Sequence, residues 1–510
     1  MTKKTWTTSV LVVVVAMLFA ACQAATTSPT PAASAPPAAS EAPAASEAPA
    51  ASEAPASGAP ATGAAVPAVP TGYDALDQAL GADKPFNGKR VTIQTQWIGG
   101  EGADFDAAVA DFEAATGIDV VQESIASQHE VVLRSRIEGK TPPDLAMLAQ
   151  PAAIVEYGNR GATQDVGKLM GADKLNEEFP SAFGTQLFSG ENGAIYAVPF
   201  KVDVKSTIWY PIKAFEAAGY TVPTTWDEMK ALEAKIVADG NGSPWCLGIK
   251  DGSATGWIAT DWLEDVMLRT AGLEAYQKWT KGEIKFDSPE VRAALDVLKE
   301  AWFTDGYVNG GFEGITATDR LESWDPMFAP DNNWDGFTPG CWMHRQATWL
   351  GPSFFPDKRA NADPAYESMY KLGEDIGIFY LPEIDPAQGK PALGAGDGLM
   401  VPTPAAGDVR PEVLATAEFL STPQGLQRGI ERGNWIAANA TTPKEWYANA
   451  YKLKVADDIV SNATSFGFDA SDQMPPEANR AFWDGISAWI DSGGADTDTF
   501  VQSVDAAWPQ

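Results

Sequence analysis

Histidine, cysteine and long apolar runs are all scarce in this sequence of 510 residues. With only His129 and His344 present, a multi-histidine zinc site is excluded. Apart from residues 10–21, no long apolar stretch is available to hold the chain in a membrane, since a spanning helix takes roughly 20 residues. We therefore expect no metal, no cofactor and no further membrane segment.

Basic residues are also few, because 36 Lys and Arg stand against 68 Asp and Glu, a formal charge of −32 at pH 7. A polyanion of this size repels nucleic acid phosphates and anionic membrane surfaces, so both are excluded as partners. Such acidity is typical of a soluble secreted protein, and it is compatible with a neutral ligand.

One acidic segment imitates the start of a calcium loop. Residues 331–336 read Asp-Asn-Asn-Trp-Asp-Gly, with ligand types at positions one, three and five and glycine at position six. Position twelve is Trp342, where such a loop requires a bidentate Glu. We therefore interpret the segment as a turn rich in Asn, Asp and Gly.

The N-terminus has the layout of an export signal. Two lysines precede an apolar run over residues 10–21, which is too short to span a bilayer comfortably. The run ends in Phe-Ala-Ala before Cys22, which resembles the lipobox of bacterial lipoproteins, although Leu is usual where Phe19 stands. The pattern predicts a signal peptide over residues 1–21 and a lipidated Cys22 that anchors the protein to the outer face of the cytoplasmic membrane. Ordinary signal cleavage nearby is the alternative.

Residues 22–70 differ in composition from the rest of the chain. They are almost entirely Ala, Pro, Ser, Thr, Glu and Gly, and they include three tandem copies of Ser-Glu-Ala-Pro-Ala followed by Ala or Ser. Such a segment has almost nothing to bury, so it does not offset its ordering entropy. We predict a semi-stiff tether, joined to the folded part by a lead-in over residues 71–87.

Two cysteines remain if Cys22 is lipidated. Cys246 and Cys341 then form an even pair in an exported, oxidising setting, which favours a disulfide between them. Two buried free thiols are the alternative.

The folded part opens with a βαβ pattern. Alternating apolar residues over 90–97 predict a strand, and apolar residues at helical spacing then follow until Gly117. The next strand is predicted over residues 118–121. This order favours an open α/β sheet with a ligand crevice at the carboxyl edge of its strands.

Helices and strands continue to alternate along the rest of the chain. A further strand is predicted over residues 394–402. Amphipathic helices are predicted over residues 226–238 (begun by Thr224 or Thr225), 262–273, 291–303, 411–420 and 477–491.

A series of motifs between residues 197 and 228 is specific enough to indicate a family. The motifs are Ala-Val-Pro-Phe at 197–200, Trp-Tyr at 209–210, Phe-Glu-Ala-Ala-Gly at 215–219 and Val-Pro-Thr-Thr-Trp-Asp-Glu at 222–228. They resemble the signature of family 1 extracellular solute-binding proteins, although Pro211 stands where that family usually has Asn or Asp.

Later stretches narrow this resemblance. They cover residues 244–249, 254–265, 340–347, 468–475 and 481–483. Together they resemble the α-glucoside-binding proteins of ABC importers, and the resemblance runs from about residue 91 to residue 509.

The resemblance implies an α/β fold like that of the periplasmic binding proteins, with two lobes joined by a hinge and a ligand cleft between them. The chain is then expected to cross between the lobes more than once, near residues 201–205 and near residues 393–397. The first lobe is expected over residues 88–203 and 395–440, and the second over residues 205–394 and 441–510.

Sugars present C–H faces and rims of hydroxyl groups, so a sugar site needs aromatic platforms as well as polar groups. The chain has 18 Trp, and core packing is the better explanation for most of them. Four are predicted to contact the ligand, namely Trp97, Trp257, Trp435 and Trp483. They are selected by their position at the edges of loops. For Trp483, resemblance to maltose-binding relatives, which have a stacking aromatic there, also counts.

Polar candidates lie just past predicted strands, at the two expected crossings and beside the second cysteine motif. They are Glu101, Gln150, Asp203, Arg345 and Asp397. A carboxylate accepts two hydroxyl hydrogen bonds and Arg donates as a fork, which suits vicinal diols. A surface or interlobe salt bridge is the alternative for each charged residue.

These features together predict a non-enzymatic solute-binding component of an ABC importer, located in the periplasm or at the cell surface. It would capture neutral α-glucosides such as maltose, trehalose or sucrose by lobe closure and deliver them, as an anchored monomer, to the permease subunits. The alternative is a secreted glycoside hydrolase, in which Asp203 and Asp397 would be the two carboxylates.

Overall fold

The computed structural model describes residues 65–180, 184–356, 368–447 and 451–509. The predicted signal peptide, the predicted lipidation site Cys22 and nearly all of the predicted tether lie outside these residues. Within the described ranges, no helix is both long enough and apolar enough to cross a membrane.

The first sheet contains six strands of the described chain, in the order β10-β9-β3-β1-β2 with β4 also paired to β9. These strands are β1 (Arg90–Thr95), β2 (Asp119–Ser124), β3 (Leu145–Leu148), β4 (Val198–Val204), β9 (Pro391–Met400) and β10 (Ser465–Phe468). β1 runs parallel to β2 and β3, so the carboxyl ends of all three lie at one edge, as the βαβ pattern predicts. β9 is buried along its whole length and runs antiparallel to β3 and β4.

A second sheet has the order β6-β7-β5-β8. Its strands are β5 (Thr207–Pro211), β6 (Ser243–Trp245), β7 (Cys341–Arg345) and β8 (Ile376–Tyr380). Cys246 follows β6 directly and is bonded to Cys341, the first residue of β7, with 5.2 Å between the two Cα atoms. The structure thus contains the disulfide that the even cysteine count favours.

Helices surround both sheets. In the first part of the chain they are α1 (Asp74–Ala79), α2 (Gly99–Thr116), α3 (His129–Glu138), α4 (Pro151–Asn159), α5 (Val166–Met170), α6 (Ala172–Glu178), α7 (Ile212–Ala218) and α8 (Trp226–Ala238). Later helices are α9 (Trp257–Thr270), α10 (Gly272–Trp279), α11 (Pro289–Phe303), α13 (Pro411–Ser421), α14 (Gln424–Glu431), α15 (Tyr451–Asn462), α16 (Ala470–Gln473), α17 (Pro476–Asp491) and α18 (Thr497–Ala507).

Local sequence signals explain several of these boundaries. α2 ends at Gly117 in the left-handed region, with φ of 76°, which glycine adopts without steric cost. α8 begins at a capping box in which Thr225 and Glu228 each accept a backbone N–H of the other. The predicted helix over 262–273 is instead two helices, because the chain turns at Gly272, where φ is 80°.

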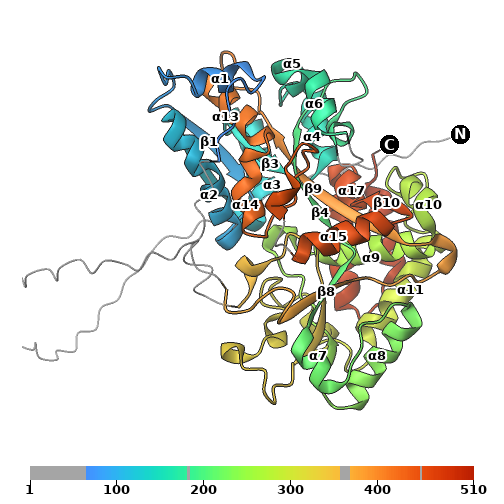
Figure 1. Cartoon of the computed structure of the whole chain (residues 1–510). Coiled ribbons are helices and arrows are strands. Elements are labelled where there is room, and N and C mark those ends of the chain that lie inside the picture. Colours follow the sequence, from blue (N-terminus) through green and yellow to red (C-terminus); the bar gives the residue numbers. More distant parts are fainter. Residues whose placement is uncertain (1–64, 181–183, 357–367, 448–450, 510) are drawn as a thin grey trace, which may run out of the picture. The chain divides into compact units, whose positions relative to one another are not determined.

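Each sheet contributes side chains to a large hydrophobic core. The first core joins α2 with α13 and α14, which come from much later in the chain and lie beside it (Figure 1). Phe112 of α2 stacks on Phe419 of α13 with 4.5 Å between the ring centroids. The lead-in also contributes to this core through Tyr73 and Leu76, so its residues are part of the fold. The second core is built mainly from α8, α9, α11, α17 and α18.

Candidate functional site

A cavity of about 160 Å³ lies at the carboxyl edge of the first sheet. One part of its wall comes from the ends of β1 and β3 and from β4 and β9, and the other part comes from α9, α16 and α17. Seven of the nine residues predicted to bind ligand line this cavity, namely Trp97, Glu101, Gln150, Asp203, Trp257, Asp397 and Trp483. Segments separated by almost 400 residues in the sequence therefore meet at one place.

The other two predicted ligand-binding residues lie outside the cavity. Trp435 is 1% exposed and packs in the first core, 5.6 Å from Trp97 and 5.4 Å from Phe200 between ring centroids. Arg345 is 1% exposed in the second sheet and pairs with Asp265 at 3.1 Å. Both side chains are thus engaged away from this cavity: Trp435 packs in the first core, and Arg345 forms a buried ion pair, whereas the alternative stated for it was a surface or interlobe salt bridge.

Three carboxylates in the cavity wall share one ammonium group. Lys201 Nζ lies 3.2 Å from Glu101, 3.0 Å from Asp203 and 3.1 Å from Asp397, and all four side chains are largely buried. Gln96 donates to the Asp397 carboxylate at 2.5 Å. β4 supplies Lys201 and Asp203, β9 supplies Asp397 and the start of α2 supplies Glu101, so this cluster joins three elements.

The pKa values in this cluster are set by its burial and by its excess of negative over positive groups. Burial lowers the pKa of Lys201, but attraction to the three carboxylates outweighs that effect and holds the pKa well above its usual value. Burial raises the pKa of Glu101 to about 7, although Lys201 opposes the increase. Lys201 is therefore charged at neutral pH, while Glu101 titrates there.

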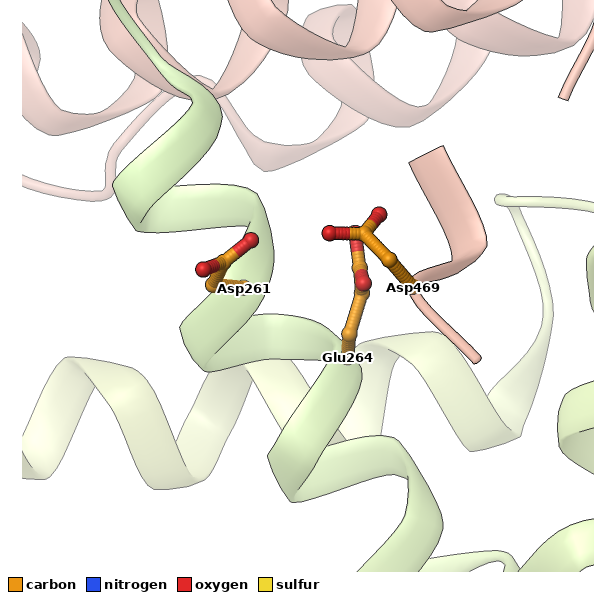
Figure 2. Close-up of side chains that lie close together, drawn as sticks. All are labelled: Asp261, Glu264 and Asp469. Atoms are coloured by element: carbon orange, nitrogen blue, oxygen red, sulfur yellow. The ribbon is translucent and has the colours of Figure 1, made fainter. Parts of the chain in front are cut away.

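A second buried cluster adjoins the cavity. Asp261, Glu264 and Asp469 bring one carboxylate oxygen each within 4.8 Å of one another, from α9 and from the residue before α16 (Figure 2). An all-oxygen set of this kind is the type that binds magnesium or calcium. However, Lys205 Nζ donates to Asp261 at 2.8 Å and also to Asp469. The ammonium of Lys205 thus supplies the positive charge at this place.

Glu264 is occupied in a different way. Its two carboxyl oxygens accept the backbone N–H groups of Ala470 at 2.8 Å and Ser471 at 3.1 Å, the first two residues of α16. The cluster therefore fixes α16 against α9, and through it Asp472, which lines the cavity.

Indole rings form the apolar part of the cavity wall. The Nε1 of Trp257 donates to Asp251 at 2.9 Å, and its ring centroid lies 6.2 Å from that of Trp349. The Arg320 guanidinium stands over both rings, at 5.9 Å and 5.4 Å, and pairs with Asp251 at 2.8 Å. Hydrogen bonds and ion pairs thus hold these rings in place, as a stacking platform requires.

Sequence reasoning did not select Gln96, Lys201, Asp251 and Trp349, which also line the cavity. Lys201 had a usable signal, because a lysine inside the apolar run of a buried strand requires a carboxylate partner. The other three had none, since a Gln, an Asp or a Trp in such positions is equally compatible with a structural role.

The calcium-like segment forms a turn, as interpreted. The Asn332 amide donates to the backbone oxygen of Met369 at 2.9 Å, and its side-chain oxygen accepts the indole N–H of Trp334. A side chain already engaged on both of its polar atoms holds the turn together.

One hydrogen bond joins two short helices that both belong to the cavity wall. The Ser253 hydroxyl, in the short helix Gly252–Ala254, donates to the backbone oxygen of Ser127, in the short helix Ala126–Gln128. Both short helices contribute residues to the cavity wall. These two segments of the wall, which are more than 100 residues apart in the sequence, therefore touch each other directly.

The raised pKa of Glu101 leads to a pH-dependent stability that a single variant isolates. Between about pH 4.5 and 7 the folded protein holds a proton on Glu101 that the unfolded chain has released, so stability falls as pH rises. Relative to Glu101→Gln, the parent is expected to lose about 1.4 kcal/mol of unfolding free energy per pH unit in this window. Urea unfolding of both proteins at pH 5.0, 6.0 and 7.5 measures the difference. A difference that stays constant with pH would contradict the assignment.

Comparison with known proteins adds independent information. Residues 97–427 match the family described as bacterial extracellular solute-binding protein. The alpha-glucosides-binding periplasmic protein AglE of Rhizobium meliloti (strain 1021) is 35% identical over 434 residues, which cover 83% of this chain and 88% of AglE. The osmoprotective compounds-binding protein GgtB of Synechocystis sp. is 31% identical over 434 residues, covering 85% and 96%. The structure of maltose-bound MalE3 from T. maritima shares the fold, with a TM-score of 0.62 at 16% identity over 82% of this chain and 98% of that one.

Proposed function

The chain belongs to the family of bacterial extracellular solute-binding proteins, and we propose that it captures neutral α-glucosides for an ABC importer. A solute-binding protein is a transport receptor and not an enzyme, so the alternative of a secreted glycoside hydrolase is set aside. The carboxylates that this alternative cast as a catalytic pair, Asp203 and Asp397, share the ammonium of Lys201.

The observation that supports a sugar most directly is the composition of the cavity wall. Indole rings of Trp257, Trp349 and Trp483 line the same space as the carboxylates of Asp203 and Asp397. Indole faces pack against the C–H face of a pyranose ring, and carboxylates accept its hydroxyl groups. No net charge is required of the ligand, because Lys201 already neutralises part of the acidic wall.

We propose that the polar contacts come from Gln96, Glu101, Gln150, Asp203 and Asp397, and the stacking contacts from Trp257 and Trp483. Asp203 and Asp397 would then serve both the ligand and Lys201. In the proposed two-lobe arrangement, residues 88–203 and 395–440 form one lobe, and residues 205–394 and 441–510 form the other. The contact between Ser253 and Ser127 is compatible with a closed state, since it joins residue 127 of the first proposed lobe to residue 253 of the second.

The names of the relatives favour the α-glucoside class. AglE is named for α-glucosides, and the T. maritima structure is named for maltose. GgtB is named for osmoprotective compounds, which makes an osmolyte the main competitor. In this proposal the protein delivers the bound sugar to the permease subunits of an ABC importer. Cys22 serves as its lipid anchor, and residues 22–70 serve as the tether.

A ligand panel tests this function. Maltose, trehalose and sucrose are compared with glycine betaine by thermal shift and then by calorimetry. We expect at least one disaccharide to bind, and at a hundred times its Kd it should raise the unfolding free energy by about 2.7 kcal/mol. Trp257→Ala should lower the affinity for that disaccharide about tenfold, because it removes a stacking face that contributes roughly 1.5 kcal/mol to binding.

Trp508→Ala is the matched control for this experiment. Trp508 is also a partly buried tryptophan, but it packs at the edge of the second core and lies outside the residues lining the cavity. We expect its variant to bind the disaccharide as the parent does. Binding of glycine betaine with no binding of any sugar would overturn the proposed function.

A further inference from the structure

A second cavity, of about 640 Å³, lies next to the first. It is lined by residues of α3, α4 and the start of α17. Glu130, Gln150 and Trp483 line both cavities, so the two spaces meet at these three side chains. We refer to these three residues as the junction.

Two buried polar atoms at the junction have no hydrogen-bond partner within the described part of the protein, namely Gln150 Oε1 and Trp483 Nε1. Gln150 is 9% exposed and Trp483 is 7% exposed. One atom is an acceptor and the other is a donor, and a hydroxyl group can both donate and accept. Because a buried polar atom without a partner costs free energy, a hydroxyl-bearing ligand at the junction would stabilise both.

The second cavity itself offers apolar surface with a charged rim. Leu148, Tyr157 and Met474 are nearly fully buried and contribute to its wall. Arg480 and Glu138, which also line it, are exposed. An apolar wall with polar groups at its edge fits a further pyranose ring, which presents C–H faces and a rim of hydroxyl groups.

We propose that the ligand passes from the first cavity across the junction into the second, so that the preferred ligand is an α-glucan of at least three glucose units. This inference rests on the proposed function and specifies the length of its ligand. Gln150 and Trp483 would contact the hydroxyl groups of the ring at the junction, while the last ring lies between α3, α4 and α17.

Calorimetry with maltose and maltotetraose tests the inference on the whole mature protein. Maltotetraose is expected to bind at least tenfold more tightly than maltose, because only the longer sugar reaches the second cavity. Equal affinities, or no binding of either glucan, would overturn it. The disaccharide panel decides the proposed function separately, so failure of one is distinguishable from failure of the other.

Filling the second cavity gives the matched test. Ala153→Trp on α4 changes a partly exposed lining position. This variant should lose the tenfold higher affinity for maltotetraose over maltose, and its affinity for maltose should stay within twofold of the parent. Ser135→Trp, at an exposed lining position on α3, is the second variant and should act in the same direction. Ala488→Trp, at an exposed position of α17 outside both cavities, should keep the full gain. If both filled variants keep the full gain, the second cavity is not part of the site.

Discussion

Replacing Lys201 with methionine is expected to lower the unfolding free energy by about 3–5 kcal/mol at pH 7.5. The ammonium lies within 3.2 Å of Glu101, Asp203 and Asp397, so its loss leaves three largely buried carboxylates without a counter-ion. Removal of one partner from a buried ion pair costs far more than loss of a surface pair, because the remaining charges stay desolvated. Urea unfolding of the ligand-free protein measures the effect.

A surface lysine provides the control for Lys201→Met. Lys168 pairs with Asp165 at 3.0 Å, but its side chain is 82% exposed. Lys168→Met should therefore change stability by no more than about 0.5 kcal/mol. The penalty of Lys201→Met should also shrink toward pH 5, because protonation of Glu101 removes one of the uncompensated charges. A penalty below 1 kcal/mol at pH 7.5 would show that the cluster tolerates the loss of its cation.

Loss of the disulfide between Cys246 and Cys341 is expected to cost about 2–5 kcal/mol. The bond closes a segment of 95 residues, and in the chain-entropy model a loop of about 100 residues gains about 4.7 kcal/mol from the crosslink. That segment includes α9, α10 and α11, which supply much of the second core. Unfolding of the parent with and without a reductant measures the contribution.

The variant with both Cys246→Ala and Cys341→Ala controls for effects of the reductant itself. It should unfold at the lower stability of the reduced parent and should not respond to the reductant. Thiol labelling of the unfolded, unreduced protein should find neither cysteine free. Two labelled cysteines besides Cys22, together with a parent whose stability does not change with the reductant, would favour the free-thiol alternative.

The elements with complete local signals could be predicted from the sequence. α8 occupies residues 226–238 as predicted, because Thr225 and Glu228 mark its start independently of the rest of the fold. The opening βαβ unit was predicted in the right order, with Gly117 ending its helix. By contrast, α1 in the lead-in was missed. Its six residues are stabilised by packing against α13, through side chains such as Leu76, and this contact joins segments more than 300 residues apart.

The sequence predicted that aromatic and carboxylate side chains would line one cleft, but it identified only some of the residues that line the cavity. Strand ends and expected crossings indicated Glu101, Gln150, Asp203 and Asp397, and the structure brings all four to one cavity. The same reasoning also selected Trp435 and Arg345, which lie outside this cavity, because the sequence does not say which way a side chain beside a loop will turn. In the structure, their large side chains fill the first core and complete a buried ion pair.

The position of β9 in the first sheet has a consequence for how an exported chain folds. β9 pairs with β3 from residue 146, with β4 from residue 198 and with β10 from residue 465. A chain that emerges with its N-terminus first presents β1, β2 and β3 long before β9, the strand that pairs with β3, and the sheet is complete only once residue 468 has emerged. Contacts this distant in sequence make folding slow, because loop closure must precede the pairing. The topology therefore delays the native sheet until nearly the whole chain has crossed the membrane.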